Sequence, residues 1–181
     1  MLKKIFYYGR ENNKKTVLSI FLLVIAIFCQ TATFLFVYQI IDKIVKNDLI
    51  TTNFMLFCAA GILISLILQT VFYKKGLDLS HEAAYGTLMN LRISLQGKLE
   101  KLPLGVIESK GIGTLKKVFV DDIDSLELLL AHGIPEGVSN LLGIIVIYIF
   151  LIFIDWKLAL LAAVTIPLGL IAVMLMYSTG S

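Results

Sequence analysis

Long uncharged stretches alternate with shorter polar ones along the chain. Two apolar stretches, residues 16–41 and 54–73, precede a charged central segment at 74–136, and two more, 137–154 and 158–178, follow it. At ~1.5 Å of rise per residue, a helix of about 20 apolar residues crosses the ~30 Å hydrocarbon core of a bilayer. The pattern therefore predicts an all-α membrane protein with four transmembrane helices, multi-pass in a lipid membrane.

The central segment predicts two long helices that leave the membrane and meet at a tip. Its first half spaces apolar or small side chains by three and four residues in turn, which is typical of a helix packed against others. No strong helix breaker precedes Pro103, so the second helix is expected to continue ~40 Å beyond the membrane. Gly111 and Gly113 favour a reversal, and a returning helix is expected from Thr114, with Pro135 as a candidate kink. The alternating positions are Leu77, His81, Ala84, Leu88, Leu91, Leu95 and Leu102.

Lysine and arginine are distributed unevenly between the polar segments. The tail before the first span holds five and the central segment eight, whereas the polar segment 42–53 holds two and the turn 155–157 holds one. Positive residues near spans are enriched on the cytoplasmic side. The N-terminus and the excursion 74–136 are therefore expected in the cytoplasm, with the protein in the cytoplasmic membrane. Residues 1–15, which are basic with interspersed aromatics, predict an interfacial elbow.

Composition and motifs argue against several other classes of function. Of 181 residues, 58% are hydrophobic and 16% charged, and the net charge of +3 does not indicate a nucleic-acid-binding surface. Two isolated cysteines and the widely separated His81 and His132 predict neither a disulfide framework nor a metal site. Residues 111–113 lack the Lys-Ser/Thr pair and the preceding strand of a phosphate-binding loop. The spans hold no ionisable group beyond tyrosine and cysteine, so an intramembrane enzyme is not supported and no catalytic residue is assigned.

Several polar or aromatic side chains fall within the first two predicted spans. Inside a bilayer, polar groups need partners on another helix or in a water-filled cavity. Two interpretations stay open, namely a lining for a substrate path and contacts between helices. The candidate residues are Gln30, Thr31, Phe34, Tyr38 and Gln69.

The motifs around the tip resemble the transmembrane half of an ABC transporter with the exporter (type IV) fold. The resemblance rests on Leu102-Pro103, the apolar residues that follow, Gly113, and Asp122 nine residues after it. The turn 155–157 and Pro167 also match. A departure is the tip itself, where Val106 and Ile107 replace the usual aromatics.

This resemblance implies a coupling element that docks on a nucleotide-binding domain, with Gly113 and Asp122 structural in the returning helix. It also implies six spans, so the chain would be the N-terminal part of a longer protein or a truncated one. A second transporter half, as homo- or heterodimer, is expected too. ATP and magnesium would bind at the nucleotide-binding domain, which would make the complete protein a translocase that hydrolyses ATP. The implied coupling residues are Pro103, Leu104, Gly105, Val106, Ile107 and Glu108.

Two further segments, 81–85 and 131–136, resemble a subgroup with the same fold that imports iron–siderophore complexes. Siderophore uptake is therefore one expectation for the substrate. Export of a lipid, peptide or drug on the same fold is the alternative. A four-span protein that acts alone in assembly or regulation is a third reading, but it explains neither the long amphipathic extension nor the spacing from Gly113 to Asp122.

Overall fold

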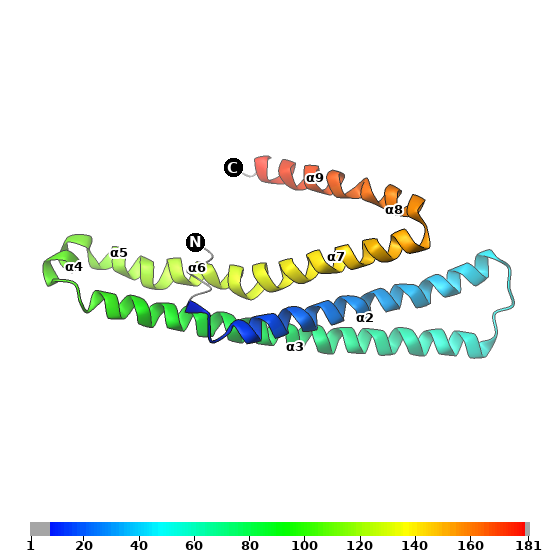
Figure 1. Cartoon of the computed structure of the whole chain (residues 1–181), viewed down its shortest axis with the longest axis horizontal. Coiled ribbons are helices and arrows are strands. Elements are labelled where there is room, and N and C mark those ends of the chain that lie inside the picture. Colours follow the sequence, from blue (N-terminus) through cyan, green and yellow to red (C-terminus); the bar gives the residue numbers. More distant parts are fainter. Residues whose placement is uncertain (1–7, 180–181) are drawn as a thin grey trace. The chain divides into compact units, whose positions relative to one another are not determined.

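The computed structural model describes residues 8–179, apart from the side chains of residues 154, 170, 173 and 177–179. Within these residues, four helices are long and apolar enough to cross a membrane, which confirms the predicted all-α membrane fold (Figure 1). They are Asn13–Val45, Thr52–Leu99, Ile112–Phe153 and Trp156–Met176. The chain divides into two units, Met1–Asn140 and Leu141–Ser181, and each is described by itself.

The first two long helices pack side by side in the first unit. Helix α2 (Asn13–Val45) has 33 residues and α3 (Thr52–Leu99) has 48, and they run along each other in Figure 1. At ~1.5 Å per residue α3 is ~72 Å long, more than twice the thickness of the hydrocarbon core. The predicted extension of the second helix is therefore present as one uninterrupted helix.

Small residues on α3 let the two helices approach closely. A Cβ atom at Gly76 would lie 2.9 Å from Cγ of Leu23, so a side chain there would force the helices apart. At the same point the Ser19 hydroxyl donates a buried hydrogen bond of 2.6 Å to the Gly76 carbonyl oxygen. Close approach through small residues combined with interhelical hydrogen bonds is typical of helix packing in membranes.

The predicted interfacial elbow at residues 1–15 lies partly outside the described residues. From residue 9 to residue 12 the chain forms turns, and α2 begins at Asn13. The elbow stays a prediction.

The tip consists of one short helix and a tight reversal. Helix α3 ends at Leu99, just before Pro103, and α4 (Leu104–Lys110) follows at the end of α3 that lies far from the 46–51 loop (Figure 1). Gly111 then adopts a φ of 76°, a left-handed conformation that favours glycine, and α5 (Ile112–Lys117) begins. Gly113 lies inside α5, where an added Cβ would meet nothing within 4 Å. Gly111 therefore makes the reversal that the sequence attributed to both glycines.

The returning helix contains two π-helical turns. It runs through α5, η1 (Val118–Asp122), α6 (Ile123–Leu128), η2 (Leu129–Gly133) and α7 (Ile134–Ile154). The predicted disturbance near Pro135 takes the form of η2, whose last hydrogen bond joins the Ile134 amide to the Leu129 carbonyl, five residues back. Single π-helical turns of this kind occur frequently at functional sites.

The second unit contains most of α7, then α8 (Trp156–Ala163) and α9 (Thr165–Thr179). The Asp155 side chain caps α8 by accepting a 2.8 Å hydrogen bond from the Lys157 amide. The span expected at 158–178 is interrupted at Val164, because Pro167 has no amide to bond the carbonyl of Ala163. The Thr165 hydroxyl bonds the neighbouring Ala162 carbonyl at 2.7 Å.

Candidate functional site

The α4 tip exposes apolar side chains that no other described element covers. Leu104 is 70% exposed and Ile112, at the start of α5, is 83% exposed, while α4 has no buried residue. Pro103 stops the preceding helix and Gly111 reverses the chain, so both ends of α4 are fixed by the backbone. The predicted coupling residues 103–108 therefore form the cap and first turns of one short, uncovered helix.

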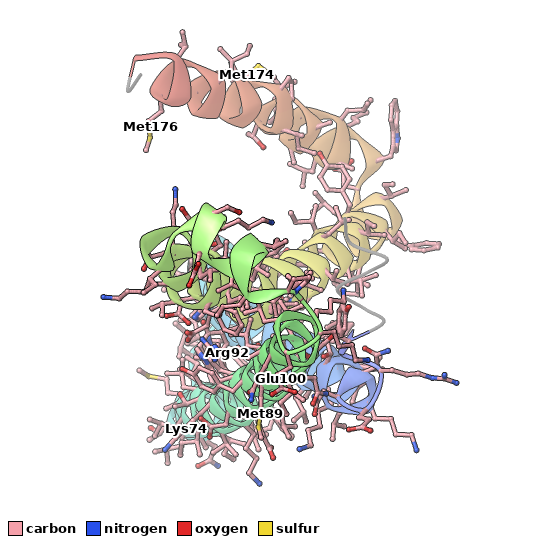
Figure 2. All side chains as sticks on the ribbon, turned by 90° about the vertical axis from the view of Figure 1, so that its left-hand side faces the viewer. Lys74, Met89, Arg92, Glu100, Met174 and Met176 are labelled. Atoms are coloured by element: carbon pink, nitrogen blue, oxygen red, sulfur yellow. The ribbon has the colours of Figure 1, made fainter. Side chains whose placement is uncertain are left out.

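Ion pairs connect the α3 extension to its neighbours. Arg92 pairs with Asp124 on α6, and Lys15 on α2 lies 2.7 Å from Glu82. Figure 2 shows Arg92 on the side of α3 that faces the returning helix, with Lys74 and Met89 on the outer side. The ion pair thus forms at Asp124, and the Asp122 carboxylate is exposed and has no ion partner in the described part of the chain. The structural role expected for Asp122 stays a prediction. Exposed pairs of this kind contribute about 0–1 kcal/mol each.

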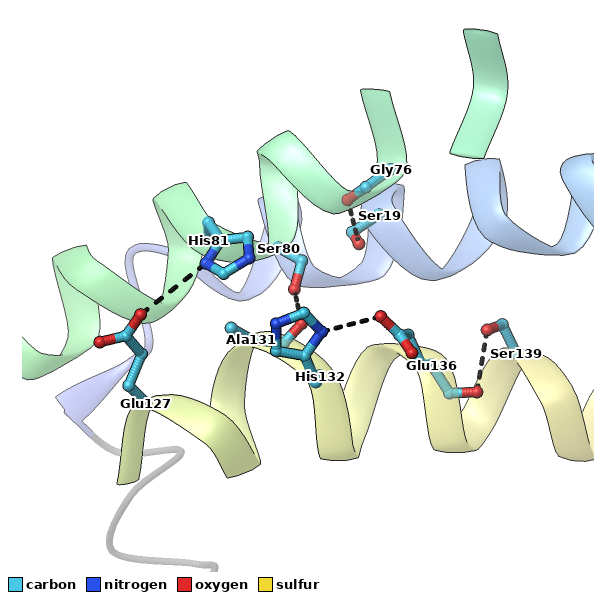
Figure 3. A network of polar contacts seen from close by, with 9 residues as sticks. All are labelled: Ser19, Gly76, Ser80, His81, Glu127, Ala131, His132, Glu136 and Ser139. Carbon is cyan, nitrogen blue, oxygen red and sulfur yellow. Dashed lines mark hydrogen bonds and ion pairs between the residues drawn. The ribbon is translucent and has the colours of Figure 1, made fainter. Parts of the chain in front are cut away.

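Two histidines that are far apart in sequence meet between α3 and η2 (Figure 3). The rings of His81 and His132 lie edge to face with centroids 4.9 Å apart. Each has a carboxylate neighbour, because Glu127 Oε1 lies 3.9 Å from Nδ1 of His81 and Glu136 Oε1 lies 2.8 Å from Nδ1 of His132. The two histidines are therefore neighbours in space although they are 51 residues apart in the sequence. In the described residues no three His, Cys, Asp or Glu side chains are placed to hold a metal ion.

A buried hydroxyl compensates for the hydrogen bond that Pro135 removes. In an α-helix the amide of residue 135 would pair with the carbonyl of Ala131, and proline has no amide hydrogen. The Ser80 hydroxyl of α3 donates to that carbonyl instead (Figure 3), and all three residues are buried. Ser80 thereby fixes α3 to the returning helix at its irregular turn.

A polar cavity of about 240 Å³ lies between α2, α3 and the start of α7. Gln30 and Gln69, both predicted for a substrate path, line it together. Glu136 also lines this cavity, and the buried Ser139 hydroxyl bonds the Glu136 backbone carbonyl at 3.1 Å. The full lining is Leu23, Ala26, Ile27, Gln30, Gln69, Tyr73, Glu136, Ser139 and Asn140.

The other predicted path residues do not line this cavity. The Thr31 hydroxyl bonds the Ile27 carbonyl of its own helix at 2.9 Å. Phe34 and Tyr38 are 65% and 63% exposed, closer to the 46–51 loop than the cavity is. Their role in a substrate path stays a prediction.

Glu136 is a residue of the candidate site that was not predicted from the sequence. It was counted with the charges of the central segment, at the boundary of the third span. A usable signal was the spacing of His132, Glu136 and Asn140, because residues four apart share one face of a helix. Two of these three residues, Glu136 and Asn140, line the cavity.

The comparison with known families agrees with the helical arrangement. A family model described as the ABC transporter transmembrane region matches residues 16–180, which is most of the chain. The chain belongs to the ABC transporter transmembrane region family. It is therefore a multi-pass membrane protein, and the family resemblance found from the sequence is confirmed.

Relatives of this transmembrane region include proteins named for mycobactin import and one named as multidrug resistance-like. It is 33% identical over 87 residues to the mycobactin import ATP-binding/permease protein IrtA of Mycolicibacterium smegmatis, covering 48% of this chain and 10% of the relative. It is 37% identical over 70 residues to the protein of the same name in Mycobacterium tuberculosis, covering 39% and 8%. It is 22% identical over 176 residues to the multidrug resistance-like ATP-binding protein MdlB of Buchnera aphidicola, covering 97% and 30%. The chain thus spans a third or less of the length of these relatives.

Proposed function

We propose that this chain is the membrane-spanning part of an ATP-driven transporter that moves its substrate across the cytoplasmic membrane by alternating access. The observation that carries the proposal is the uncovered apolar helix α4 at the end of two long helical extensions. Family membership supports it. In this account α4 docks on a nucleotide-binding domain, through contacts from residues 103–108.

The two extensions can transmit motion from the tip to the spans. Helix α3 is continuous over 48 residues, and the returning helix packs on it through α6 and η2. Arg92–Asp124 and Ser80–Ala131 fix the two helices together at separate points. A displacement of α4 would therefore move both extensions as one body, and the π-helical turns are the places where the returning helix can bend.

In the proposed transporter, ATP is bound and hydrolysed by a nucleotide-binding domain and not by the residues of this chain. The turn 111–113 has neither the lysine nor the hydroxyl residue that a phosphate-binding loop requires. ATP and magnesium would bind at the nucleotide-binding domain and supply the energy of the cycle. A second transporter half, identical or different, would complete the substrate path.

We favour an iron–siderophore complex, taken up into the cell, as the substrate. Support comes from the relatives named for mycobactin import, which are the more identical ones over the matched residues. The alternative is export of a lipid, peptide or drug, and it draws on the multidrug resistance-like relative, whose match covers 97% of the chain. Family membership weighs against a four-span protein that acts alone in assembly or regulation.

The orientation of the chain in the membrane tests this function. ATP is available on the cytoplasmic side, so α4 has to lie on that side to dock on a nucleotide-binding domain. A phosphatase reporter, active only outside the cytoplasm, is expected to be active when fused at Asn47 and inactive when fused at Ser109 of α4. Five and eight basic residues in the tail and the central segment favour this arrangement. A tip found outside the cytoplasm would refute the coupling role of α4.

A further inference from the structure

We propose that the cavity beside Glu136 binds a protonated amine, which in the complete transporter is carried by the substrate. The natural occupant rests on the proposed transport function. The preference for an ammonium group rests on the lining, the position and the size of the cavity.

The charge of the lining favours a cation. Glu136 is the one acidic side chain among the described lining residues, and none of them is lysine or arginine. Nδ1 of His132 lies 2.8 Å from Oε1 of Glu136 and donates the hydrogen between them whenever Glu136 is a carboxylate, since a carboxylate only accepts. A carboxylate has about four acceptor sites, so Glu136 can accept further hydrogen bonds from a ligand.

The other lining residues offer contacts for the remaining hydrogens and the carbon substituents of an ammonium group. Gln30, Gln69 and Asn140 offer carbonyl oxygens as neutral acceptors, and Tyr73 offers an aromatic ring, whose face attracts cations. Leu23, Ala26 and Ile27 are apolar and match the methyl or methylene groups that surround a charged nitrogen. The cavity thus combines one negative charge, neutral acceptors and an apolar wall.

The position of the cavity strengthens the attraction. Gln30 lies inside the predicted span 16–41 and Gln69 inside the predicted span 54–73, whereas Glu136 is the last residue of the charged segment before the third span. The cavity therefore extends from the boundary of the third span into the part of the first two helices that lies in the hydrocarbon core. Charges interact more strongly at such a boundary than in water, because part of their surroundings is hydrocarbon.

The size of the cavity limits what it holds. Its volume of about 240 Å³ is below the ~300–1,000 Å³ of pockets that enclose a whole drug-sized ligand. It therefore receives one charged group of a larger substrate, or a small ion such as tetramethylammonium.

The test uses thiol labelling of the complete transporter in membrane vesicles. Cys29 and Cys58 are changed to serine, and Asn140→Cys places a thiol in the cavity. The rate at which this thiol reacts with a cationic reagent, a trimethylammonium methanethiosulfonate, is compared with its rate with an anionic one, a sulfonate methanethiosulfonate. The cationic reagent is expected to react faster, and Glu136→Gln is expected to lower the cation-to-anion rate ratio about tenfold or more. His132→Gln, which keeps an uncharged hydrogen-bond donor beside Glu136, should leave the cation preference in place.

Protection by a small cation completes the experiment. Tetramethylammonium is expected to slow labelling of the introduced thiol. Neopentyl alcohol, which is uncharged and of similar shape, is expected not to slow it, and Glu136→Gln should abolish the protection by tetramethylammonium. Equal rates for the two reagents, or a cation preference or protection that survives Glu136→Gln, would overturn the cation site. These rates need neither ATP nor coupling at α4, so their failure is distinct from a failure of the proposed function.

Discussion

Replacing Leu104 and Ile107 together by aspartate is expected to uncouple ATP hydrolysis from transport in the complete transporter. Leu104 is 70% exposed on α4, and both residues lie in the segment that the docking account places against the nucleotide-binding domain. Loss of a central apolar anchor costs about 2 kcal/mol or more of binding free energy, a factor of about 30. Two buried carboxylates add a desolvation penalty. Substrate flux should therefore fall at least about tenfold while ATP hydrolysis continues.

The matched control places the same two charges at the other end of the bundle. Leu49 is 91% exposed in the 46–51 loop and Ile50 follows it, so Leu49→Asp with Ile50→Asp changes charge without touching the tip. Flux and ATP hydrolysis are both measured in reconstituted vesicles. If the tip variant and the loop variant gave the same flux per ATP hydrolysed, α4 would have no role in coupling.

Ser80→Ala is expected to lower the free energy of unfolding by about 1–3 kcal/mol, the cost of a buried polar group left without a partner. The carbonyl of Ala131 has lost its helical partner to Pro135, and the Ser80 hydroxyl replaces it in a buried position. In the Ser80→Ala background, Pro135→Ala restores an amide for this carbonyl. The double variant should therefore be more stable than the sum of the two single changes predicts.

A double-mutant cycle in lipid bicelles measures this coupling, because it cancels the packing lost with the proline ring. Ser109→Ala is the control, since its hydroxyl also bonds a carbonyl, that of Val106 at 2.9 Å, but on the exposed surface of α4. A change within about 0.5 kcal/mol is expected there. Additive effects of Ser80→Ala and Pro135→Ala would show that the hydroxyl does not compensate for the proline.

The sequence predicted the helices well because their signals are local. Uncharged runs of about 20 residues mark spans, and Pro103 marks the end of the α3 extension within a few residues. Family motifs around Leu102-Pro103 added the identity of the chain, and the matched model confirms it. The four spans and the long second helix therefore followed from composition and spacing.

Contacts between helices were not predictable in the same way. The meeting of His81 with His132, and of Ser80 with Ala131, joins residues 51 apart and depends on the register of α3 against the returning helix. The apolar pattern alone leaves that register open. The π-helical turns also escaped prediction, although Pro135 indicated where one of them lies. Glu136 was missed because it was assigned to the charged segment before its neighbours were known.

Cross-linking from the tip tests the central claim most directly. A photoactivatable amino acid at Leu104 is introduced in the complete transporter, with the same substitution at Leu49 as control, because both positions are exposed at opposite ends of the bundle. The account predicts that illumination joins position 104 to peptides of the nucleotide-binding domain, identified by mass spectrometry, and that position 49 yields none. Absence of these peptides at position 104, or equal yields at both positions, would contradict the docking of α4.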